Sequence, residues 1–334
     1  MDHAEVQPQI GDASALASAG SNAAPVRRDV APAALAVAPA PGRWARFLDG
    51  DVWHSFRGSP TAIAAAAVAA LCLFAAVFAN VIAPHDPFNL ATLELSDSML
   101  PPAWMQGGTT KYLLGTDEQG RDVLSALMFG ARISLFVGGA SVLLSLVLGV
   151  GLGLVSGYVG GRLDALIMRV CDVMLSFPSI LIALILIAVL GQGIGKVIAA
   201  LVTVQWAYYA RTVRSAALVE RRKEYVEAAR CLALSPMRIV FRHLLPNCLP
   251  PLIVVATVQV AAAIALEATL SFLGLGLPIT EPSLGLLIAN GYQYLLSGKY
   301  WISFFPGIAL LLTIVSINLV ADQLRDVLNP RLSR

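Results

Sequence analysis

Long apolar runs that carry no charge are the feature that most constrains the fold of this chain. Of its 334 residues, 57% are hydrophobic and only 13% are charged, whereas soluble domains carry roughly 25% charged residues. A helix of about 18 or more apolar residues can cross the hydrocarbon core of a bilayer. Five runs reach this length: residues 61–83, 133–157, 173–190, 249–266 and 300–321.

A sixth, shorter candidate covers residues 197–210. Lys196 and Arg211 bound it, and their long side chains can extend to the two interfaces of a membrane. The fourth run also continues past Glu267 to Leu273. The sequence therefore predicts an all-α, polytopic membrane protein with six transmembrane helices, and an even number places both termini on one side.

The distribution of basic residues predicts which side that is. If the N-terminus is cytoplasmic, 18 of the 23 Lys and Arg residues lie in cytoplasmic segments and 5 in external ones. Such an excess is typical of cytoplasmic loops, so we expect both termini in the cytoplasm of a bacterial cell whose inner membrane the chain crosses. The net charge of +2 is too small to indicate a nucleic-acid partner.

The runs divide the chain into segments with different expected roles. Residues 1–42 are rich in Ala, Pro and Ser and predict a disordered cytoplasmic tail. The first apolar run begins too late for an ordinary signal peptide, so we expect a retained helix. The expected segments are 43–83 with the first transmembrane helix, 84–132 outside, 133–322 as a five-helix core, 211–248 as a cytoplasmic loop and 323–334 as a cytoplasmic C-terminus.

The external segment, residues 84–132, has an irregular, proline-rich first half. Residues 116–119 fit a capping box, and the apolar residues Leu124, Leu127 and Met128 then fall on one helical face. We expect this helix to lie along the outer membrane surface. The acidic residues Asp117, Glu118 and Asp122 lack the ligand spacing of a calcium loop, which favours roles in capping and turns.

Other patterns predict packing rather than chemistry. Small residues recur at every fourth position of the second run, a spacing that allows close helix contact: Ser141, Ser145, Gly149, Gly153, Gly157 and Gly161. Residues 191–196 resemble a phosphate-binding loop but have Leu190 and Val197 where Gly and Ser or Thr are needed, so we predict a tight turn. The four cysteines, Cys72, Cys171, Cys231 and Cys248, form no CxxC pair, and we interpret them as apolar fillers.

No catalytic or metal-binding motif is evident, so the sequence predicts a non-enzymatic chain that cannot itself hydrolyse ATP. Its most informative segment is the basic loop, residues 211–247. A helix is predicted over residues 214–232, a turn at Ala233 and Leu234, and a second helix over 236–245. Ser235 would cap this second helix with Pro236 at its first position, and Pro246 would stop it. The alternative is a solvated basic loop held at anionic lipid.

This loop carries a family resemblance. Residues 224–230 (Glu-Tyr-Val-Glu-Ala-Ala-Arg) and 242–247 (Arg-His-Leu-Leu-Pro-Asn) resemble the EAA loop of ABC importer permeases. Residues 114–122, 130–135, 157–161, 270–276 and 322–326 also match the dipeptide/oligopeptide/nickel class, in its second ("C") permease subunit. External residues 101–104 with Gly107 and Gly108 favour the dipeptide branch. Together the matches cover about residues 55–333.

The resemblance implies a type I ABC importer fold in which the loop docks in a cleft of an ATPase subunit. The implied partners are a homologous permease subunit, two ATP-binding subunits and a periplasmic or lipid-anchored peptide-binding protein. ATP and Mg²⁺ would be bound by the ATPase subunits and no cofactor by this chain. The residues implied at the docking contact are Glu224, Glu227, Ala228, Ala229, Ala233, Ser235, Arg238, Leu245 and Pro246. Ala233 departs from the family, which usually has Gly there, so the turn either avoids positive φ or is strained by about 1 kcal/mol.

Two carboxylates in or beside the apolar runs are candidates for the translocation pathway, because a charge at mid-bilayer costs roughly 3 kcal/mol. Asp172 has Arg169 three residues earlier as a structural partner. Glu267 has no such neighbour and is expected either to line the pathway or to bond a neighbouring helix. Asp322, Arg325 and Asp326 predict an ion-pair network at the cytoplasmic end of the last run.

The resemblance implies an ATP-driven importer subunit that moves dipeptides or short peptides from the periplasm to the cytoplasm. A second reading within the family is import of nickel or another small solute. A reading from another class is a proton-coupled secondary transporter that uses Asp172 and Glu267, although no inverted repeat of broken helices supports it. A third is an anchor or scaffold.

Overall fold

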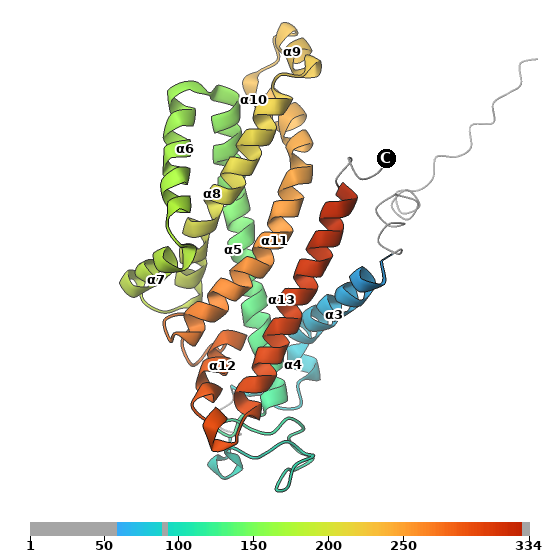
Figure 1. The fold of residues 1–334 in the computed structure, drawn as a ribbon, viewed down its shortest axis with the longest axis vertical. Helices are drawn as coiled ribbons and strands as arrows, with labels where there is room; N and C mark the ends of the chain where they lie inside the picture. Colours follow the sequence, from blue (N-terminus) through green and yellow to red (C-terminus); the bar gives the residue numbers. More distant parts are fainter. Residues whose placement is uncertain (1–58, 89–92, 329–334) are drawn as a thin grey trace, which may run out of the picture. The chain divides into compact units, whose positions relative to one another are not determined.

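The computed structural model describes residues 59–88 and 93–328, and the expected tail, residues 1–42, lies outside them. All of the described residues belong to one unit, residues 46–334, which is built from packed helices (Figure 1). By length and apolar composition, four helices of this described part can cross a membrane: α3 (Pro60–Val77), α5 (Val123–Val159), the continuous path Pro236–Phe272, and α13 (Trp301–Leu328).

A fifth span is present if the bent pair α6 (Gly161–Ser176) and α7 (Ser179–Leu190) counts as one. The two helices meet at 93°, so the prediction of one straight helix over residues 173–190 was wrong. Phe177 precedes Pro178 and is extended, with φ −99° and ψ 147°, which is the conformation that a following proline favours. Pro178 therefore ends α6. A hydropathy average over the run depends on composition alone and does not reveal this bend.

The predicted short span 197–210 lies inside α8 (Ile194–Glu220), which has 27 residues. Within the described residues, α8 is not one of the helices that are long and apolar enough to cross a membrane. The turn before it has the tight geometry that was predicted, because Gly191 has φ +82° and Gly193 has φ +137°. Gln192 Nε2 also donates to the Gly274 carbonyl at 2.7 Å, which ties this turn to the end of α11.

The first transmembrane helix is held against the second. At the start of α3, the Ser59 hydroxyl accepts from the Ala62 amide at 3.4 Å and Pro60 occupies the first turn. At its end, Arg132 of α5 donates to the Ala76 and Val77 carbonyls at 2.8 and 3.1 Å. These carbonyls have no partner within the helix, so Arg132 both caps α3 and fixes it to α5. The short α4 (Ala79–Ile82) follows.

The interfacial helix that was predicted outside the membrane is instead the first part of α5. Asp122 is its N-cap and accepts from the Ser125 amide at 3.0 Å. The capping box predicted at residues 116–119 was wrong, because Asp117 accepts the backbone amides of Gln119 and Arg121, both at 2.9 Å, and so forms a turn. A β-bridge between Thr116 and Asp122 closes this turn, and the helix starts after it.

Helix α5 packs on α8 through the predicted stripe of small residues. A Cβ added at Gly149 would lie 2.5 Å from the Trp206 carbonyl oxygen, and one at Gly153 would lie 2.6 Å from that of Ala210. The backbones of the two helices therefore touch, as small-residue spacing predicts. Gly161 is not part of this contact, because α5 ends at Val159 and Gly161 begins α6 with φ +63°.

The helix α12 (Leu284–Tyr292) was not predicted. It packs on α13, α11 and α5, and Figure 1 shows it at the opposite end of α11 from α9 and α10. Two glycines allow this position: a Cβ at Gly285 would lie 2.4 Å from the Ala268 carbonyl oxygen, and one at Gly291 would lie 2.5 Å from the Ser303 amide nitrogen. Two short 3-10 turns are also present: η1 (Leu95–Asp97) between α4 and α5, and η3 (Leu295–Ser297) between α12 and α13.

The cysteines follow their prediction in part. Cys171 and Cys248 are buried among apolar residues and Cys72 is half-buried. Cys231 is exposed, so its interpretation as an apolar filler was wrong. It is the last residue of α9.

Candidate functional site

The candidate site is the segment that joins α8 to α11, residues 221–245, called here the hairpin. It contains α9 (Glu224–Cys231), a turn, α10 (Pro236–Arg238) and the π-helical turn η2 (Ile239–Leu244), which continues directly into α11 (Leu245–Phe272). Figure 1 shows α9 beyond the ends of the long helices, where it projects away from them. A single helix over residues 214–232 was predicted, and this was wrong because α8 ends at Glu220 and α9 begins at Glu224.

A polar cluster fixes the break between α8 and α9. Glu220 accepts from Lys223 Nζ and from the Tyr225 hydroxyl, both at 2.6 Å. Asn247, at the start of α11, donates to the same hydroxyl at 3.2 Å. Burial would raise the pKa of Glu220, but the hydrogen bonds from Lys223 and Tyr225 outweigh it and lower that pKa. Burial and the bond to Glu220 raise the pKa of Tyr225 to about 12, so at neutral pH the link joins a carboxylate to a neutral phenol.

The second half of the hairpin does not stop at Pro246, as was predicted. Pro246 occupies the first turn of α11, where a missing N–H costs little. The preceding turn is π-helical, with the Leu245 amide bonded to the Val240 carbonyl. A proline ring clashes with the carbonyl four residues earlier in an α-helix, and the wider π turn lets the helical path continue to Phe272.

The turn after α9 is a Schellman motif with alanine in the left-handed position. Ala233 has φ +51°, its amide bonds the Arg230 carbonyl at 2.9 Å, and the Leu234 amide bonds the Ala229 carbonyl at 3.2 Å. These are the two bonds that define the motif. The expected turn is therefore confirmed, and of the two alternatives for Ala233 the structure has positive φ.

Ser235 occupies the N-cap position of α10, with Pro236 next to it, as predicted. Its hydroxyl makes no capping hydrogen bond. The fixed φ of Pro236 and the bond from the Ile239 amide to the Ser235 carbonyl at 3.1 Å start this helix instead. The serine side chain is exposed and left free for other contacts.

Apolar side chains hold the hairpin to the long helices. Val226, Ala229, Ile239 and Leu244 are buried in one cluster with residues of α5, α8 and α11. The Arg230 guanidinium also lies 5.8 Å from the centre of the Tyr158 ring on α5, close enough for a cation–π contact. A segment that is packed in this way moves together with the helices to which it is attached.

Of the nine predicted docking residues, seven are exposed and two are not. Ala229 is buried and Leu245 half-buried, so these two support the hairpin from within. The other seven are exposed: Glu224, Glu227, Ala228, Ala233, Ser235, Arg238 and Pro246.

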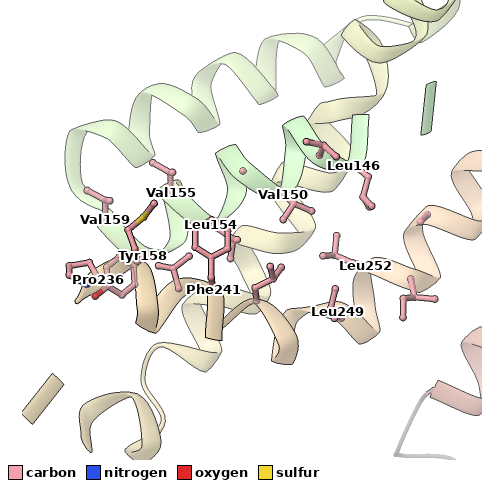
Figure 2. A pocket seen from close by; sticks show the side chains of 17 residues that line it. Leu146, Val150, Leu154, Val155, Tyr158, Val159, Pro236, Phe241, Leu249 and Leu252 are labelled. Atoms are coloured by element: carbon pink, nitrogen blue, oxygen red, sulfur yellow. The ribbon is translucent and has the colours of Figure 1, made fainter. Parts of the chain in front are cut away.

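Three large apolar residues on this surface were missed by the sequence analysis. The exposed fractions are 74% for Leu232, 68% for Met237 and 56% for Phe241. Met237 and Phe241 are four residues apart, a spacing that places both on one helical face and that could have identified them. They also line an apolar groove of about 730 Å³ between α5 and the path from α10 to α11 (Figure 2).

The charged pathway candidate Asp172 has a different partner from the one predicted. It pairs with Arg211 of α8 at 2.5 Å, not with Arg169 of its own helix, and both side chains of the pair are more than half exposed. A second pair, between Asp164 of α6 and Arg214 of α8, has two N–O distances of 2.5 and 2.7 Å. The two pairs hold α6 against α8. This tertiary contact cannot be predicted from the sequence of one helix alone.

Glu267 is fully buried in α11. Its carboxylate accepts from the Ser134 hydroxyl of α5 at 2.9 Å and from the Ser271 hydroxyl at 2.7 Å. Ser134 in turn accepts from the Leu284 amide at the start of α12, at 3.2 Å. Glu267 therefore bonds a neighbouring helix, one of the two roles expected for it, while a role in lining a pathway stays a prediction.

The predicted ion-pair network of Asp322, Arg325 and Asp326 is not formed. All of the described ion pairs lie elsewhere. Asp322 is exposed on the last turns of α13, and Arg325 and Asp326 are exposed three and four residues further along. Residues 329–334, which contain two further arginines, lie outside the described ranges.

Comparison with known proteins gives matches over most of the chain. Residues 149–334 match the family described as binding-protein-dependent transport system inner membrane component. Residues 49–102 match the N-terminal TM domain of oligopeptide transport permease C. The first match contains the hairpin and the second contains α3.

Individual relatives agree with the family matches. The chain is 40% identical to the di/tripeptide transport system permease protein DppC of Pseudomonas aeruginosa (strain UCBPP-PA14), over 84% of this chain and 92% of the relative. It is 45% identical to the dipeptide transport system permease protein DppC of Escherichia coli (strain K12), over 85% and 93%. A solved structure titled as inward-facing MetNI methionine ABC transporter has a similar fold, with a TM-score of 0.50 and 21% identity over 61% of this chain and 96% of that one.

Two family matches and extended identity to curated permeases thus agree with the helical architecture. The chain belongs to the family of binding-protein-dependent transport system inner membrane components, as a multi-pass, non-catalytic permease subunit of an ABC importer of the OppC/DppC type.

Proposed function

We propose that this permease moves dipeptides or short peptides from the periplasm to the cytoplasm. The names of the relatives support the substrate class, because they are described as dipeptide and di/tripeptide transport proteins. The identity to them covers more than nine-tenths of their length. Import of nickel or another small solute has no comparable support.

The proposed coupling element is the hairpin. It combines a rigid attachment through Val226, Ala229, Ile239 and Leu244 with an exposed outer surface, which supports docking to an ATPase subunit. On this proposal the exposed Glu227 and Ala228 lie at the contact, beside Leu232, Met237 and Phe241. ATP and Mg²⁺ are bound by two ATPase subunits, and closure of these subunits pulls on the hairpin.

The proposed topology is a type I importer with six spans, in which α8 is counted as a span. The hairpin and both termini face the cytoplasm, and residues 93–122 with α12 face the periplasm. The concentration of Lys and Arg, 18 of 23 in the proposed cytoplasmic segments, supports this orientation. A second permease subunit and a peptide-binding protein complete the complex.

Of the two pathway candidates, Asp172 fits the proposal better than Glu267. The Asp172–Arg211 pair is more than half exposed, so its charged groups are accessible to a passing substrate. Glu267 has no exposed surface and instead holds α12 through Ser134.

The observation that carries this proposal is the packed, outward-facing hairpin in a chain of this family. The test is to purify the chain in mild detergent together with the products of its neighbouring genes, and to measure ATP-dependent uptake of labelled dialanine in proteoliposomes. We expect two ATPase subunits to co-purify and uptake to stop when ATP is withheld. Uptake that survives without ATP and collapses with the proton gradient would instead establish a secondary transporter.

A further inference from the structure

The apolar groove between α5 and the path from α10 to α11 has a volume of about 730 Å³ and no charged residue in its lining. Along α5 it extends from Leu146 to Val159, which is about 20 Å at the rise of an α-helix. Figure 2 shows Tyr158, Val159 and Pro236 together at one end of it. We call this end the mouth of the groove.

The position of α5 across the bilayer indicates which part of the membrane reaches the groove. No charged residue follows Arg132 in this helix. From Arg132 to Val159 the helix rises about 40 Å, which matches the 40–45 Å thickness of a bilayer with its headgroup layers. With Arg132 at one membrane surface, Leu146 lies near the mid-plane and Val159 in the opposite headgroup layer. The groove therefore spans one leaflet, on the side of the hairpin.

Basic side chains surround the mouth of the groove. The Arg230 guanidinium lies 5.8 Å from the centre of the Tyr158 ring, which lines the groove. Arg238 and Arg242 each directly follow a lining residue of the α10–η2 segment. All three arginines are exposed, and the ion pairs among the described residues involve none of them. The hairpin as a whole carries six basic and two acidic side chains, a charge that attracts anionic headgroups.

The occupant of this groove has to come from within the membrane, because a water-soluble ATPase subunit cannot enter the hydrocarbon layer. The two candidates are a transmembrane helix and a lipid. A helix is about 10–12 Å across with its side chains, so a 20 Å length of it takes about 1,900 Å³, more than twice the volume of the groove. Acyl chains are thinner, and a phosphate headgroup carries the charge that complements the arginines at the mouth.

We propose that the groove binds an anionic phospholipid from the leaflet on the hairpin side. Its acyl chains lie between α5 and α11, and its phosphate lies near Arg230, Arg238 and Arg242. The inference goes beyond the proposed function and does not depend on the transported substrate. With the proposed orientation of the hairpin, the lipid belongs to the cytoplasmic leaflet, where anionic lipids attract basic segments next to the membrane.

The test uses the full chain in mild detergent, with the subunits that co-purify with it, after removal of native lipid. Native mass spectrometry measures the retention of dioleoyl phosphatidylglycerol, which is anionic, and of dioleoyl phosphatidylcholine, which has the same acyl chains and no net charge. We expect wild type to retain the anionic lipid about tenfold better, since each nearby basic residue strengthens its binding about fivefold.

The arginine variants test the mouth. Arg230→Gln should lower the preference for phosphatidylglycerol about fivefold. Arg222→Gln is the matched control, because Arg222 is an exposed arginine of the same hairpin that lines a separate surface of α8. This control should keep the wild-type preference.

The glycine variants test the groove itself. A Cβ added at Gly151, which lines the groove, has no neighbouring side chain or helix within 4 Å. The same is true of Gly139, which lies on α5 outside the groove. Gly151→Leu should fill the groove and reduce the retention of both lipids about tenfold, while Gly139→Leu should retain them as wild type does.

Equal retention of the two lipids by wild type, or wild-type retention by Gly151→Leu, would overturn the proposal. Lipid binding that occurs in the isolated chain and disappears with the partner subunits present would overturn it too, and would assign the groove to a partner helix. If Gly151→Leu fails to assemble, the arginine variants decide alone, and equal effects of Arg230→Gln and Arg222→Gln contradict the site. Because no transport is measured, failure of peptide uptake leaves the lipid site standing, and failure of lipid binding leaves the proposed function standing.

Discussion

The end formed by residues 93–122 and α12, called here the loop end, contains a buried, hydrogen-bonded cluster around Asp117, whereas the outer surface of the hairpin exposes large apolar side chains. At the loop end, Asp117 accepts three hydrogen bonds, two from backbone amides and one from Arg121 Nε at 2.7 Å. The Trp301 indole donates to the Thr116 carbonyl at 3.1 Å. At the hairpin end, Leu232 and Met237 are each more than two-thirds exposed.

This difference indicates what each end depends on. A buried, hydrogen-bonded cluster contributes to folding stability, since breaking it leaves charges and polar groups without water. Large apolar residues that are exposed on a rigid surface contribute little to the folding stability of the isolated chain. Such surfaces mark sites of protein contact. Substitutions at the loop end should therefore change stability, and substitutions at the hairpin surface should change assembly.

The largest expected effect is at the loop end. Asp117→Ala removes the partner of Arg121, and both side chains are at least nine-tenths buried. Leaving one member of a buried ion pair alone typically costs about 3–5 kcal/mol. We expect a large decrease in the melting temperature of the purified chain in detergent, measured by tryptophan fluorescence.

Asp86→Ala is the control for this substitution. Asp86 lies between α4 and the loop end and accepts one exposed hydrogen bond, from the Phe88 amide at 3.0 Å. Its loss should change stability by no more than about 0.5 kcal/mol. Equal melting temperatures for the Asp117 and Asp86 variants would show that the loop end does not depend on its buried cluster.

A weaker but more selective effect is expected at the hairpin. Met237→Asp places a charge in the exposed apolar surface, where a partner would have to desolvate it. We expect binding of the ATPase subunit to weaken by about 2 kcal/mol, roughly 30-fold, while the melting temperature of the isolated chain stays unchanged. The measurement is the amount of ATPase retained through detergent purification.

Leu296→Asp gives the matched comparison, because Leu296 is a fully exposed apolar residue at the loop end. This variant should retain its ATPase. If both variants lose it, the hairpin surface is not a specific contact, and if neither does, the exposed apolar residues there have no role in docking.

The sequence predicted the long apolar helices well, because a bilayer-crossing helix needs only a continuous apolar composition. It failed where two helices share one apolar run. The bend at Pro178 and the unpredicted α12 both depend on local geometry, namely the extended residue before a proline and the close packing allowed by Gly285. A composition window averages over both features.

The hairpin shows the same limit at finer scale. Its turn was predicted from Ala233, Ser235 and Pro236, since these residues act through local backbone preferences. The break after Glu220 contains no glycine or proline, and it is fixed by Tyr225 and by Asn247, which lies 22 residues further along the chain than Tyr225. Asp172 likewise pairs with Arg211, which is distant in sequence, and not with the nearby Arg169 that was predicted.

The smallest expected effect concerns the stability of the hairpin itself. Ala233 has φ +51°, a conformation that costs a residue with a Cβ about 1–2 kcal/mol and glycine nothing. Part of this gain is lost because glycine is more flexible in the unfolded chain, so Ala233→Gly should stabilise the turn by about 0.5–1 kcal/mol. Hydrogen exchange of the Ala233 and Leu234 amides, which form the two bonds of the Schellman motif, should slow by a few-fold.

Ala228→Gly is the control with the opposite sign. Ala228 is exposed in the interior of α9, where glycine costs about 1 kcal/mol relative to alanine, so exchange in the hairpin should become faster. If both substitutions speed exchange, the turn does not hold positive φ at residue 233 in solution. If they act with opposite signs, this chain tolerates a strained turn at the end that we assign to the ATPase. The Ala233→Gly substitution would then remove the backbone strain from the hairpin. ATP-dependent uptake by the Ala233→Gly transporter would measure whether coupling to the ATPase depends on that strain.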